Sequence, residues 1–242
     1  MEMTGKVALV TGSAHRIGRA MACRLADEGM HVAIHWNRSR EQALATMAAC
    51  QARGVEALTV QGDLSDPSIA PEIIAEASTL GPVQVLVNNA SRFVPNRLLE
   101  IDATQLEIDH RIHVVSPTIL ARELVKRLPG GLPGRIIHIL DWRASAADPR
   151  YLSYGLAKAG LLHLMKMLAA ELAPEITVNG ISPGSILPPS NELASGPTMK
   201  PKAESGENPS LDLLTDVLIQ LVRQDDGSTG QVVAVEGWRT MS

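Results

Sequence analysis

Short runs of apolar, mostly β-branched residues alternate along the chain with longer segments in which apolar residues have helical spacing. The run KVALVTG at 6–12 meets a glycine, and RIGRAMACRLADEG at 16–29 follows with helical spacing and a terminal glycine. This pattern predicts a strand, a tight turn and a helix. It is repeated, with strands expected at 31–36, 56–64, 83–91, 134–141, 176–182 and 230–237 and helices at 39–53, 68–80, 104–128, 152–172 and 211–223.

The alternation of strands with helices indicates the class of fold. A helix between two strands makes a right-handed crossover and leaves the two strands parallel. The strands are near-continuous apolar runs, as expected of a sheet that is covered on both faces. We therefore predict an α/β fold of the Rossmann type, a doubly wound parallel sheet of about seven strands, formed by residues 1–242 as a single domain.

One segment departs from the alternation. Between residues 184 and 209 the composition changes to Pro, Ser, Gly, Asn, Lys and Glu. A loop of this length inside a compact domain is more often functional than idle, so a substrate lid is the preferred interpretation. A surface insertion without a role in the site is the alternative.

Composition and charge argue against several classes of partner. The formal net charge is −4, and the chain has no basic stripe of the kind that neutralises nucleic-acid phosphates. No apolar run reaches the ~18 to 20 residues of a membrane-spanning helix, and no signal peptide precedes the first strand, so a cytoplasmic protein is expected. Cys23 and Cys50 fall on separate predicted helices without metal-ligand spacing, so we expect no metal site and assign these thiols no chemistry.

The segment TGSAHRIG at 11–18 lies between the first strand and its helix. A turn there presents backbone N–H groups and a helix amino terminus to a pyrophosphate, which predicts a dinucleotide site. Gly12 would allow the tight turn and Gly18 the close helix packing, while Arg16 replaces a usual glycine and brings a cation to the phosphates. Further residues expected at the cofactor are His15, Ile17, Leu64, Asn89, Ala90, Pro183, Gly184 and Ser185.

The end of the second strand predicts which dinucleotide binds. A site for NADH usually carries an acidic residue there for the ribose 2′-hydroxyl, but AIHWNRSRE has no acid before its last residue. His35, Asn37, Arg38 and Ser39 instead offer cationic and neutral donors that suit a 2′-phosphate. NADPH is therefore the expected cofactor, and the alternative is that Arg38 and Arg40 only solvate the start of a helix. Asp63 is placed to accept a hydrogen bond from the adenine amino group.

Tyr154 and Lys158 are four residues apart on a predicted helix and so share one face. A tyrosine with a pKa of ~10 donates protons poorly at neutral pH, and a nearby ammonium together with the charge of a nicotinamide is expected to lower that pKa. Lysine at this spacing can also bind the nicotinamide ribose. Combined with the glycine-rich turn, NNAS at 88–91 and SPG at 182–184, the pair predicts an oxidoreductase.

Together these motifs resemble the short-chain dehydrogenase/reductase family over the whole chain, from TGSAHRIG through NNA and YGLAK to VVAVEG. In most of that family the residue thirteen positions before the tyrosine is serine, whereas this chain has Asp141. The pteridine reductases and the bacterial dihydromonapterin reductases place aspartate there. They are also similar to this chain in the arginine of TGSAHRIG, in HWNRS, in NNASRF and, for the dihydromonapterin reductases, in IHVVSP, where His113 replaces a family asparagine.

The chemistry of the residues agrees with this resemblance. A serine hydroxyl suits a carbonyl because it can donate to an oxyanion, whereas a pterin presents a C=N bond whose nitrogen must gain a proton. Asp141 could supply or relay that proton, or it could accept hydrogen bonds that orient Tyr154 and a ring N–H; a cap on the chain after the fifth strand is the structural alternative. The expected catalytic residues are Asp141, Tyr154 and Lys158.

Phe93 is the only phenylalanine of the chain and follows Ser91 by two residues. A flat heteroaromatic ring would stack on Phe93 against the nicotinamide, unless Phe93 only plugs its loop. The resemblance implies that Phe93 stacks on a pterin, that Ser91 hydrogen-bonds its amino edge, and that Arg16 faces both cofactor phosphate and pterin. Asp141 and Tyr154 complete the expected substrate site, and its possible further walls are Trp142, Tyr151 and Leu187.

The expected activity is the NADPH-dependent reduction of a dihydropterin such as dihydromonapterin, dihydrobiopterin or dihydrofolate. The alternatives are a carbonyl reductase of the same family that acts on an acyl thioester or a sugar, and a protein that senses NADPH without turnover. The resemblance also implies a homotetramer with interfaces at 104–128 and 152–172. VEGW at 235–238 replaces the usual VDGG and places Trp238 where most relatives have glycine, which leaves specificity open.

Overall fold

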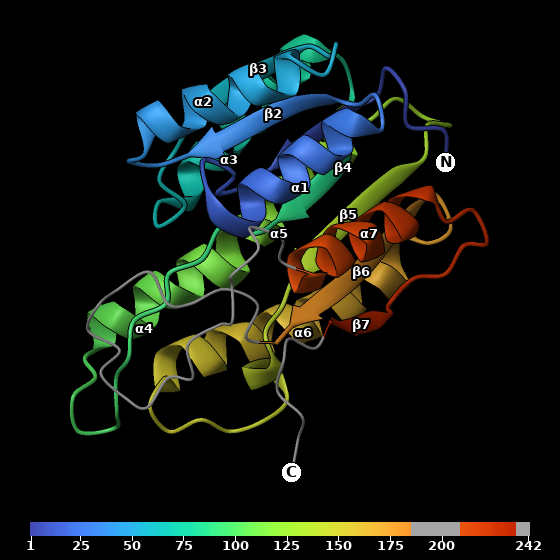
Figure 1. Ribbon diagram of the computed structural model, residues 1–242. Coiled ribbons are helices and arrows are strands. Elements are labelled where there is room, and N and C mark those ends of the chain that lie inside the picture. The colour runs from blue at the N-terminus through green and yellow to red at the C-terminus, as the bar shows by residue number, and fades with distance from the viewer. Residues whose placement is uncertain (185–208, 236–242) are drawn as a thin grey trace.

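The computed structural model describes residues 1–184 and 209–235 (Figure 1). These residues form a seven-stranded parallel sheet in the order β3-β2-β1-β4-β5-β6-β7, which confirms the predicted doubly wound fold. The strands are β1 Val7–Val10, β2 His31–Trp36, β3 Ala57–Gln61, β4 Val83–Asn88, β5 Gly134–Ile139, β6 Ile176–Pro183 and β7 Val232–Val235. The helices are α1 Arg16–Asp27, α2 Arg40–Gln51, α3 Ala70–Ala77, α4 Ala103–His110, α5 Ser116–Arg127, α6 Leu152–Leu172 and α7 Pro209–Arg223.

Four predictions fall outside this part of the chain. Residues 185–208 of the expected lid, which include Ser185 and Leu187, are not among the described residues, and neither is Trp238.

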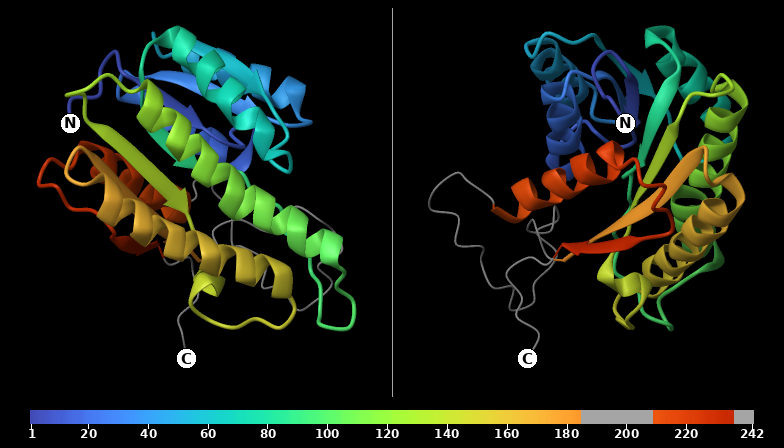
Figure 2. Two further views of the ribbon diagram at one scale, coloured as in Figure 1. Left: turned by 180° about the vertical axis from the view of Figure 1, so that it is seen from behind. Right: turned by 90° about the vertical axis from the view of Figure 1, so that its right-hand side faces the viewer.

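The sheet has a layer of helices on each face (Figure 2). Helices α1, α2 and α7 pack on one face, and α3, α5 and α6 pack on the other. Successive strand residues point to opposite faces of a sheet. In β1, accordingly, Ala8 and Val10 belong to the first core cluster, and Val7 and Leu9 belong to the second. Burial on both sides explains why the strands are apolar throughout.

The order of the strands places a ligand crevice between β1 and β4. From β1 the chain proceeds to β2 and β3 on one side, and from β4 it proceeds to β5, β6 and β7 on the other. The connections that follow β1 and β4 therefore diverge at the carboxyl edge of the sheet. Open α/β sheets bind their ligands at such a switch point.

The predicted helix at 104–128 is divided by a wide turn. Helix α4 ends at His110, a π-helical turn covers Arg111–Val115, and α5 begins at Ser116. Pro117 has no N–H to donate to the carbonyl of His113, so the regular α-helical bond cannot form there. The wide turn accommodates this loss, and π turns inside helices are frequent at functional sites. Its one buried residue is His113.

The predicted third strand, 56–64, ends early. Strand β3 stops at Gln61, and Oδ1 of Asp63 accepts a hydrogen bond from the backbone N–H of Ser65 at 2.9 Å. Such an aspartate turn competes with the sheet for the backbone. Residues 62–64 therefore lie beyond the strand, at the carboxyl edge of the sheet, where the crevice lies.

Within the described ranges no helix is long and apolar enough to cross a membrane. The same residues contain no cluster of three or more His, Cys, Asp or Glu side chains suited to a metal ion.

Candidate active site

The turn after β1 is so closely packed that two of its positions accept only glycine. Gly12 has a φ of +63°, and a Cβ there would lie 2.8 Å from Cα of Ala90. A Cβ on Gly18 would lie 2.3 Å from the carbonyl oxygen of Gly12 and 2.7 Å from Nδ2 of Asn89. The steric roles expected of Gly12 and Gly18 agree with these contacts. The amino end of α1 can thus lie close to the turn, as a pyrophosphate site requires.

Arg16 has a strained backbone. Its φ of +56° is the only positive value for a non-glycine residue in the described ranges. The left-handed conformation costs an L-residue roughly 1–2 kcal/mol, and strain of this kind clusters at functional sites. Arg16 is also the first residue of α1, directly after the N-cap residue His15. A cation is unfavourable at the positive end of a helix dipole, so this arginine suits a site that holds an anion.

Thr11 connects the turns that follow β1 and β4, and the sequence analysis did not single it out. Its Oγ1 accepts hydrogen bonds from the backbone N–H groups of Asn89 and Ala90 at 2.9 and 3.0 Å. Nδ2 of Asn89 in turn donates to the carbonyl oxygens of Thr11 and Gly12 at 2.8 and 3.1 Å. The two segments expected to contact the cofactor, the glycine-rich turn and NNA, therefore form one rigid unit.

His35 has a different place from the one predicted. It is buried, its Nδ1 accepts a hydrogen bond from the N–H of Gly12 at 3.1 Å, and its Nε2 lies 3.1 Å from the carbonyl oxygen of Gly62. Burial lowers the pKa of His35 to about 4, so the ring is neutral. The prediction of a cationic donor to the 2′-phosphate is wrong for this residue. His35 instead stabilises the Gly12 turn by accepting the hydrogen bond from its backbone N–H.

Two of the groups expected around the ribose phosphate and the adenine, Asn37 and Asp63, lie at one cavity. A cavity of about 410 Å³ is lined by Asn37, Gly62 and Asp63 together with Gln61, Asp66 and Ile69. Burial alone would raise the pKa of Asp63, but hydrogen bonds from Ser65 and Asn37 outweigh burial and lower it. The carboxylate is thus ionised and can accept from an amino group.

Arg38 and Ser39 follow Asn37 directly in the chain. The charge of Arg38 acts on Asp63, and Arg38 itself is exposed. Ser39 is the N-cap residue of α2, yet its side chain makes no capping hydrogen bond. An exposed guanidinium and an uncommitted hydroxyl at the start of a helix suit an anionic ligand.

Other residues expected at the cofactor are held in place by the core. Ile17 packs against the first core cluster, and Leu64 is buried in the second. The carbonyl oxygen of Leu64 accepts a hydrogen bond from Oγ of Ser116 at 2.7 Å. Pro183 ends β6, and the N–H of Gly184 donates to the carbonyl oxygen of Val235 at 2.8 Å.

The expected catalytic groups Asp141 and Tyr154 are in contact. The hydroxyl of Tyr154 donates a hydrogen bond to Oδ2 of Asp141 at 3.1 Å. Oδ1 of Asp141 accepts from the backbone N–H of Arg143 at 2.8 Å and from its Nη1 at 3.2 Å. Asp141 does cap the 3₁₀ turn that follows β5, as in the structural alternative, but it does so with one oxygen only. The other oxygen is left for the tyrosine.

The pKa of Tyr154 is raised well above its usual value of 10.0, whereas the sequence analysis expected it to be lowered. Burial is the main cause, and the charge and hydrogen bond of Asp141 act in the same direction. A hydrogen bond from Ser91 and the charge of Arg143 oppose the rise without cancelling it. Tyr154 therefore holds its proton throughout the neutral range.

Lys158 is buried one turn further along α6. Its Nζ donates to the carbonyl oxygen of Ile139 at 2.7 Å and lies 5.6 Å from the centre of the Tyr154 ring. Burial lowers the pKa of Lys158 to about 8, against the smaller raising effect of Asp141. The ammonium is consequently anchored to the end of β5, beside the tyrosine ring rather than on its hydroxyl.

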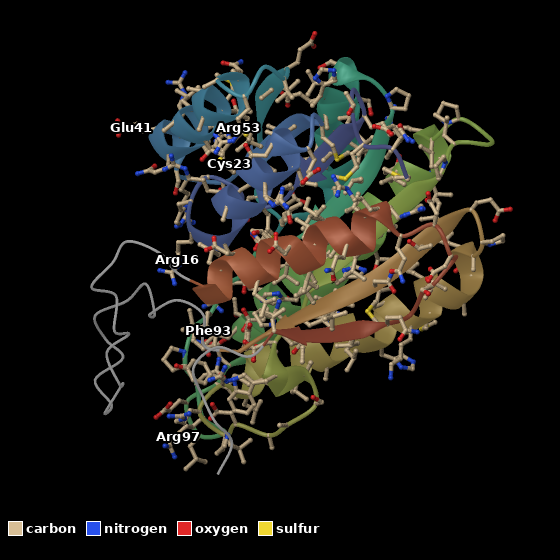
Figure 3. All side chains as sticks on the ribbon, turned by 45° about the vertical axis from the view of Figure 1, so that its right-hand side comes forward. Arg16, Cys23, Glu41, Arg53, Phe93 and Arg97 are labelled. Carbon is tan, nitrogen blue, oxygen red and sulfur yellow. The ribbon has the colours of Figure 1, made fainter. Side chains whose placement is uncertain are left out.

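Aromatic rings surround the tyrosine. Phe93 stacks on Tyr151 with the ring centres 4.2 Å apart, and it meets Tyr154 edge to face at 4.8 Å. The guanidinium of Arg143 lies over both Phe93 and Tyr151, at 5.2 and 4.8 Å from their centres, and over Trp142 at 4.3 Å. Phe93 and Arg16, both labelled in Figure 3, come from the segments after β4 and β1, on the two sides of the crevice.

His113 both packs on Tyr154 and lies within reach of a backbone carbonyl. Its ring packs edge to face on Tyr154 at 5.3 Å, and its Nε2 lies 3.3 Å from the carbonyl oxygen of Arg92. Burial, then the charge of Lys158, lowers its pKa well below the usual 6.5, so the ring is neutral. His113 is thus a neutral ring that packs against the Tyr154 side chain.

Arg143 is the main residue that the sequence analysis missed. It binds Asp141, and its Nε donates to Oδ2 of Asp148 at 3.0 Å. Arg150 pairs with the same carboxylate from the other side. The spacing Asp-x-Arg after a strand was visible in the sequence, but an arginine there could equally have been solvated. Its position between a carboxylate and three aromatic rings required the structure.

These features are those of a dinucleotide-dependent oxidoreductase, and comparison with known proteins gives the family. The short chain dehydrogenase family matches residues 6–195, and this chain belongs to it. Members of this family are NAD(P)H-dependent oxidoreductases, which confirms the predicted class of enzyme.

Three similar proteins differ in their substrates. The chain is 31% identical to 3-oxoacyl-[acyl-carrier-protein] reductase FabG of Staphylococcus aureus, over 98% of both chains. It is 35% identical to NADPH-dependent aldehyde reductase 2 of Arabidopsis thaliana, over 76% of this chain and 73% of the relative. It also resembles the structure of FolM alternative dihydrofolate reductase 1 from Brucella canis complexed with NADP, with a TM-score of 0.85, 31% identity and coverage of 99% and 97%.

Proposed function

We propose that the chain reduces a dihydropterin, such as dihydromonapterin, dihydrobiopterin or dihydrofolate, to the tetrahydropterin with NADPH. The observation that carries this proposal is the hydrogen bond of Tyr154 to Asp141, next to the ring of Phe93. The similarity to a dihydrofolate reductase of the FolM type supports it. Each part of the site has a counterpart in the chemistry of a pterin.

Asp141 serves this substrate as an acceptor. Two N–H groups of Arg143 donate hydrogen bonds to Oδ1. Oδ2 then faces the reaction centre as an acceptor for donors. A pterin ring carries N–H and amino donors, whereas a ketone carries none. The orienting role, of the two that the sequence left open for Asp141, is therefore the one we propose.

Tyr154 is the proton donor in this proposal. Because its pKa lies well above neutrality, it enters each cycle protonated. Reduction of the C=N bond adds one hydride to carbon and one proton to nitrogen. Bound NADPH supplies the hydride. Tyr154 transfers its hydroxyl proton to the ring nitrogen and regains a proton from water, and the ammonium of Lys158 near its ring stabilises the transient phenolate.

Phe93 and Ser91 would position the ring. Phe93 now stacks on Tyr151 at an interplanar angle of 12°, so its face already accepts a flat partner. Ser91 reaches Tyr154 with its side chain. We propose that the pterin lies against Phe93 and hydrogen-bonds Ser91 and Asp141, with Arg16 across the crevice.

The proposed cofactor is NADPH. Arg38, Asn37 and Ser39 gather at the start of α2, the place of the ribose 2′-phosphate in folds of this class. No acidic residue lies in β2 or between it and α2. The solved Brucella structure that resembles this chain is an NADP complex.

The consumption of NADPH, followed by its absorbance, tests the proposal with three dihydropterins and two comparators, a 3-oxoacyl thioester and an aldehyde. Turnover of a dihydropterin with an efficiency at least about tenfold above both comparators would support it. Turnover of a comparator alone would contradict it and leave a carbonyl reductase. That second candidate is favoured by the 31% identity to the 3-oxoacyl reductase over nearly the whole chain.

We further propose that the protein is a homotetramer. Leu106 on α4, Val125 on α5, and Leu156 and Met167 on α6 are large apolar side chains with 38% to 61% of their surface exposed. Exposed apolar side chains on neighbouring helices are typical of subunit interfaces. Sedimentation equilibrium of the wild type and Met167→Glu tests this, because the charged variant should dissociate. A monomeric wild type would contradict it.

A further inference from the structure

Asn96 is a buried polar residue in the segment between β4 and α4, three residues after Phe93. Its N–H donates a hydrogen bond to the carbonyl oxygen of Arg150 at 2.9 Å, and its own carbonyl oxygen accepts one from the N–H of Leu152 at 3.2 Å. Asn96 and Tyr151 thus form an isolated parallel β-bridge. The segment that carries Phe93 is therefore fastened to the start of α6.

The side chain of Asn96 adds a third hydrogen bond to this junction. Its Oδ1 accepts from the backbone N–H of Ser153 at 3.0 Å. Helix α6 begins at Leu152, and the first N–H groups of a helix have no backbone partner inside it. Asn96 binds the first two of them, one with its carbonyl oxygen and one with Oδ1. It therefore caps α6 from another segment of the chain.

This cap takes the place of one that α6 does not make itself. The N-cap residue of α6 is Tyr151, whose side chain forms no capping hydrogen bond and instead stacks on Phe93 with the ring centres 4.2 Å apart. A helix is usually capped by its own N-cap residue, where Ser, Thr, Asp and Asn are preferred. Here an aromatic ring stands at that position, and the asparagine belongs to the segment of Phe93. One junction consequently fixes both the ring of Phe93 and the first turn of α6.

Ser153 connects this junction to Tyr154. Ser153 is buried, it directly precedes Tyr154 in α6, and its Oγ donates to the carbonyl oxygen of Gln105 on α4 at 3.2 Å. Asn96 and α4 thus hold Ser153 from two sides. Asp141 binds the hydroxyl of Tyr154 at the other end of the side chain. The contacts of Ser153 determine where the tyrosine stands, and Asp141 determines where its hydroxyl points.

We propose that Asn96 is a positioning residue for catalysis, which aligns the proposed proton donor Tyr154 with a substrate that lies against Phe93. Loss of Oδ1 would leave the N–H of Ser153 without its partner and would free the first turn of α6 to shift. A displacement of about 1 Å can lower a rate about 10²-fold. The inference rests on the proposed role of Tyr154 as the proton donor, but it does not require that the substrate is a pterin.

Steady-state kinetics of Asn96→Ala test the proposal. The substrate is whichever one the wild type reduces, a dihydropterin or one of the two comparators, so failure of the pterin assignment leaves this test intact. Turnover is expressed per bound NADPH, so that unfolded protein does not count. We expect kcat to fall at least about tenfold, while the Kd for NADPH stays within about twofold of the wild type, because the cofactor turn is not touched.

Two further variants at the same position separate the lost acceptor from a general loss of stability. Nδ2 of Asn96 makes no hydrogen bond within the part of the chain that the structure describes, so Asn96→Asp removes none and keeps an acceptor oxygen. An anion is also favourable at a helix amino terminus, and Asn96→Asp should retain kcat within about threefold of the wild type. A serine hydroxyl ends one bond short of Oδ1, so Asn96→Ser is a milder change with the same expected fall as Asn96→Ala.

Asp226→Ala is the matched control. Oδ1 of Asp226 accepts from the backbone N–H of Ser228 at 2.9 Å in the loop before β7, at the edge of the sheet opposite the crevice. Loss of this bond should leave kcat unchanged. A fall in kcat of less than about tenfold in both Asn96→Ala and Asn96→Ser would overturn the proposal. So would an Asn96→Asp variant that is as slow as Asn96→Ala, because the acceptor would then not be what matters.

Discussion

The hydroxyl of Tyr154 donates a hydrogen bond to Oδ2 of Asp141 at 3.1 Å, while Arg143 holds Oδ1 of the same carboxylate. Most of the family carries serine at this position, and a serine hydroxyl can donate as well as accept. Oδ2 of Asp141 is the acceptor in this pair and Tyr154 is the donor. The exchange of serine for aspartate thereby keeps the proton on the tyrosine and turns the neighbouring position into an acceptor.

Replacement of Asp141 by asparagine should reduce pterin turnover. The asparagine keeps the shape of the side chain but removes the charge that raises the pKa of Tyr154, so that pKa should fall. The amide also has one acceptor oxygen in place of two, so it orients the pterin less well, and we expect kcat/KM for a dihydropterin to fall about 10- to 150-fold, as for the loss of one hydrogen bond to a charged group. Steady-state kinetics with NADPH measure this effect. Asp141→Ser is the second variant, and equal pterin turnover in all three proteins would rule out a role for the carboxylate.

Arg143 should act as a positioning residue through Asp141. Arg143→Met retains much of the packing against Phe93 but removes both the guanidinium bond to Oδ1 and the link to Asp148. We expect kcat/KM for the dihydropterin to fall roughly tenfold, in line with the loss of one charge-assisted hydrogen bond. Arg143→Lys should retain part of the wild-type kcat/KM because lysine keeps a cation at this position. If the two variants are equally impaired, the charge is not what matters. NADPH binding, measured by fluorescence, should be unchanged in both.

Lys158 should make the protein more stable as the pH rises. Its pKa falls from 10.5 to about 8 on folding, because burial disfavours the ammonium. Between these pH values the unfolded chain binds a proton that the folded chain does not, so the free energy of unfolding increases with pH. The free energy of unfolding should rise by roughly 2–4 kcal/mol between pH values of about 8 and 10.5. Urea denaturation at several pH values, compared with Lys158→Met, measures it. Parallel curves for the two proteins would contradict the shift.

Gly18→Ala should damage the cofactor turn. The added Cβ would lie 2.3 Å from the carbonyl oxygen of Gly12, which forces α1 away from the turn. We expect a loss of roughly 1–3 kcal/mol in the free energy of unfolding, together with weaker NADPH binding. Gly130→Ala is the matched control, because a Cβ there meets nothing within 4 Å and its φ is not positive. That control should remain within about 0.5 kcal/mol of the wild type.

The sequence predicted those parts of the site that depend on local geometry. Gly12 and Gly18 follow from the turn between a strand and a helix, and Tyr154 and Lys158 follow from the spacing of one helical turn. The strand and helix pattern predicted the doubly wound sheet, because alternation of this kind permits few topologies. Each of these inferences needed only residues that are close together in the chain.

The predictions that failed depended on contacts between distant segments. His35 looked like a surface donor, but the Gly12 turn and Gly62 close over it and leave it buried and neutral. The pKa of Tyr154 was expected to be lowered by Lys158 together with the charge of a nicotinamide, whereas among this chain's own groups burial and Asp141 raise it. Burial and long-range charge are not visible in local spacing.

Arg38 should decide between NADPH and NADH. It is exposed next to Asp63 at the start of α2, where it would pair with the 2′-phosphate. Loss of a charged hydrogen bond of roughly 1.5–3 kcal/mol corresponds to about a 10- to 150-fold higher KM. Arg38→Leu should therefore raise the KM for NADPH by this factor and leave the KM for NADH unchanged. Arg40→Leu is the control, because Arg40 begins the same helix. Equal, small effects of both variants would mean that these arginines only solvate the start of α2.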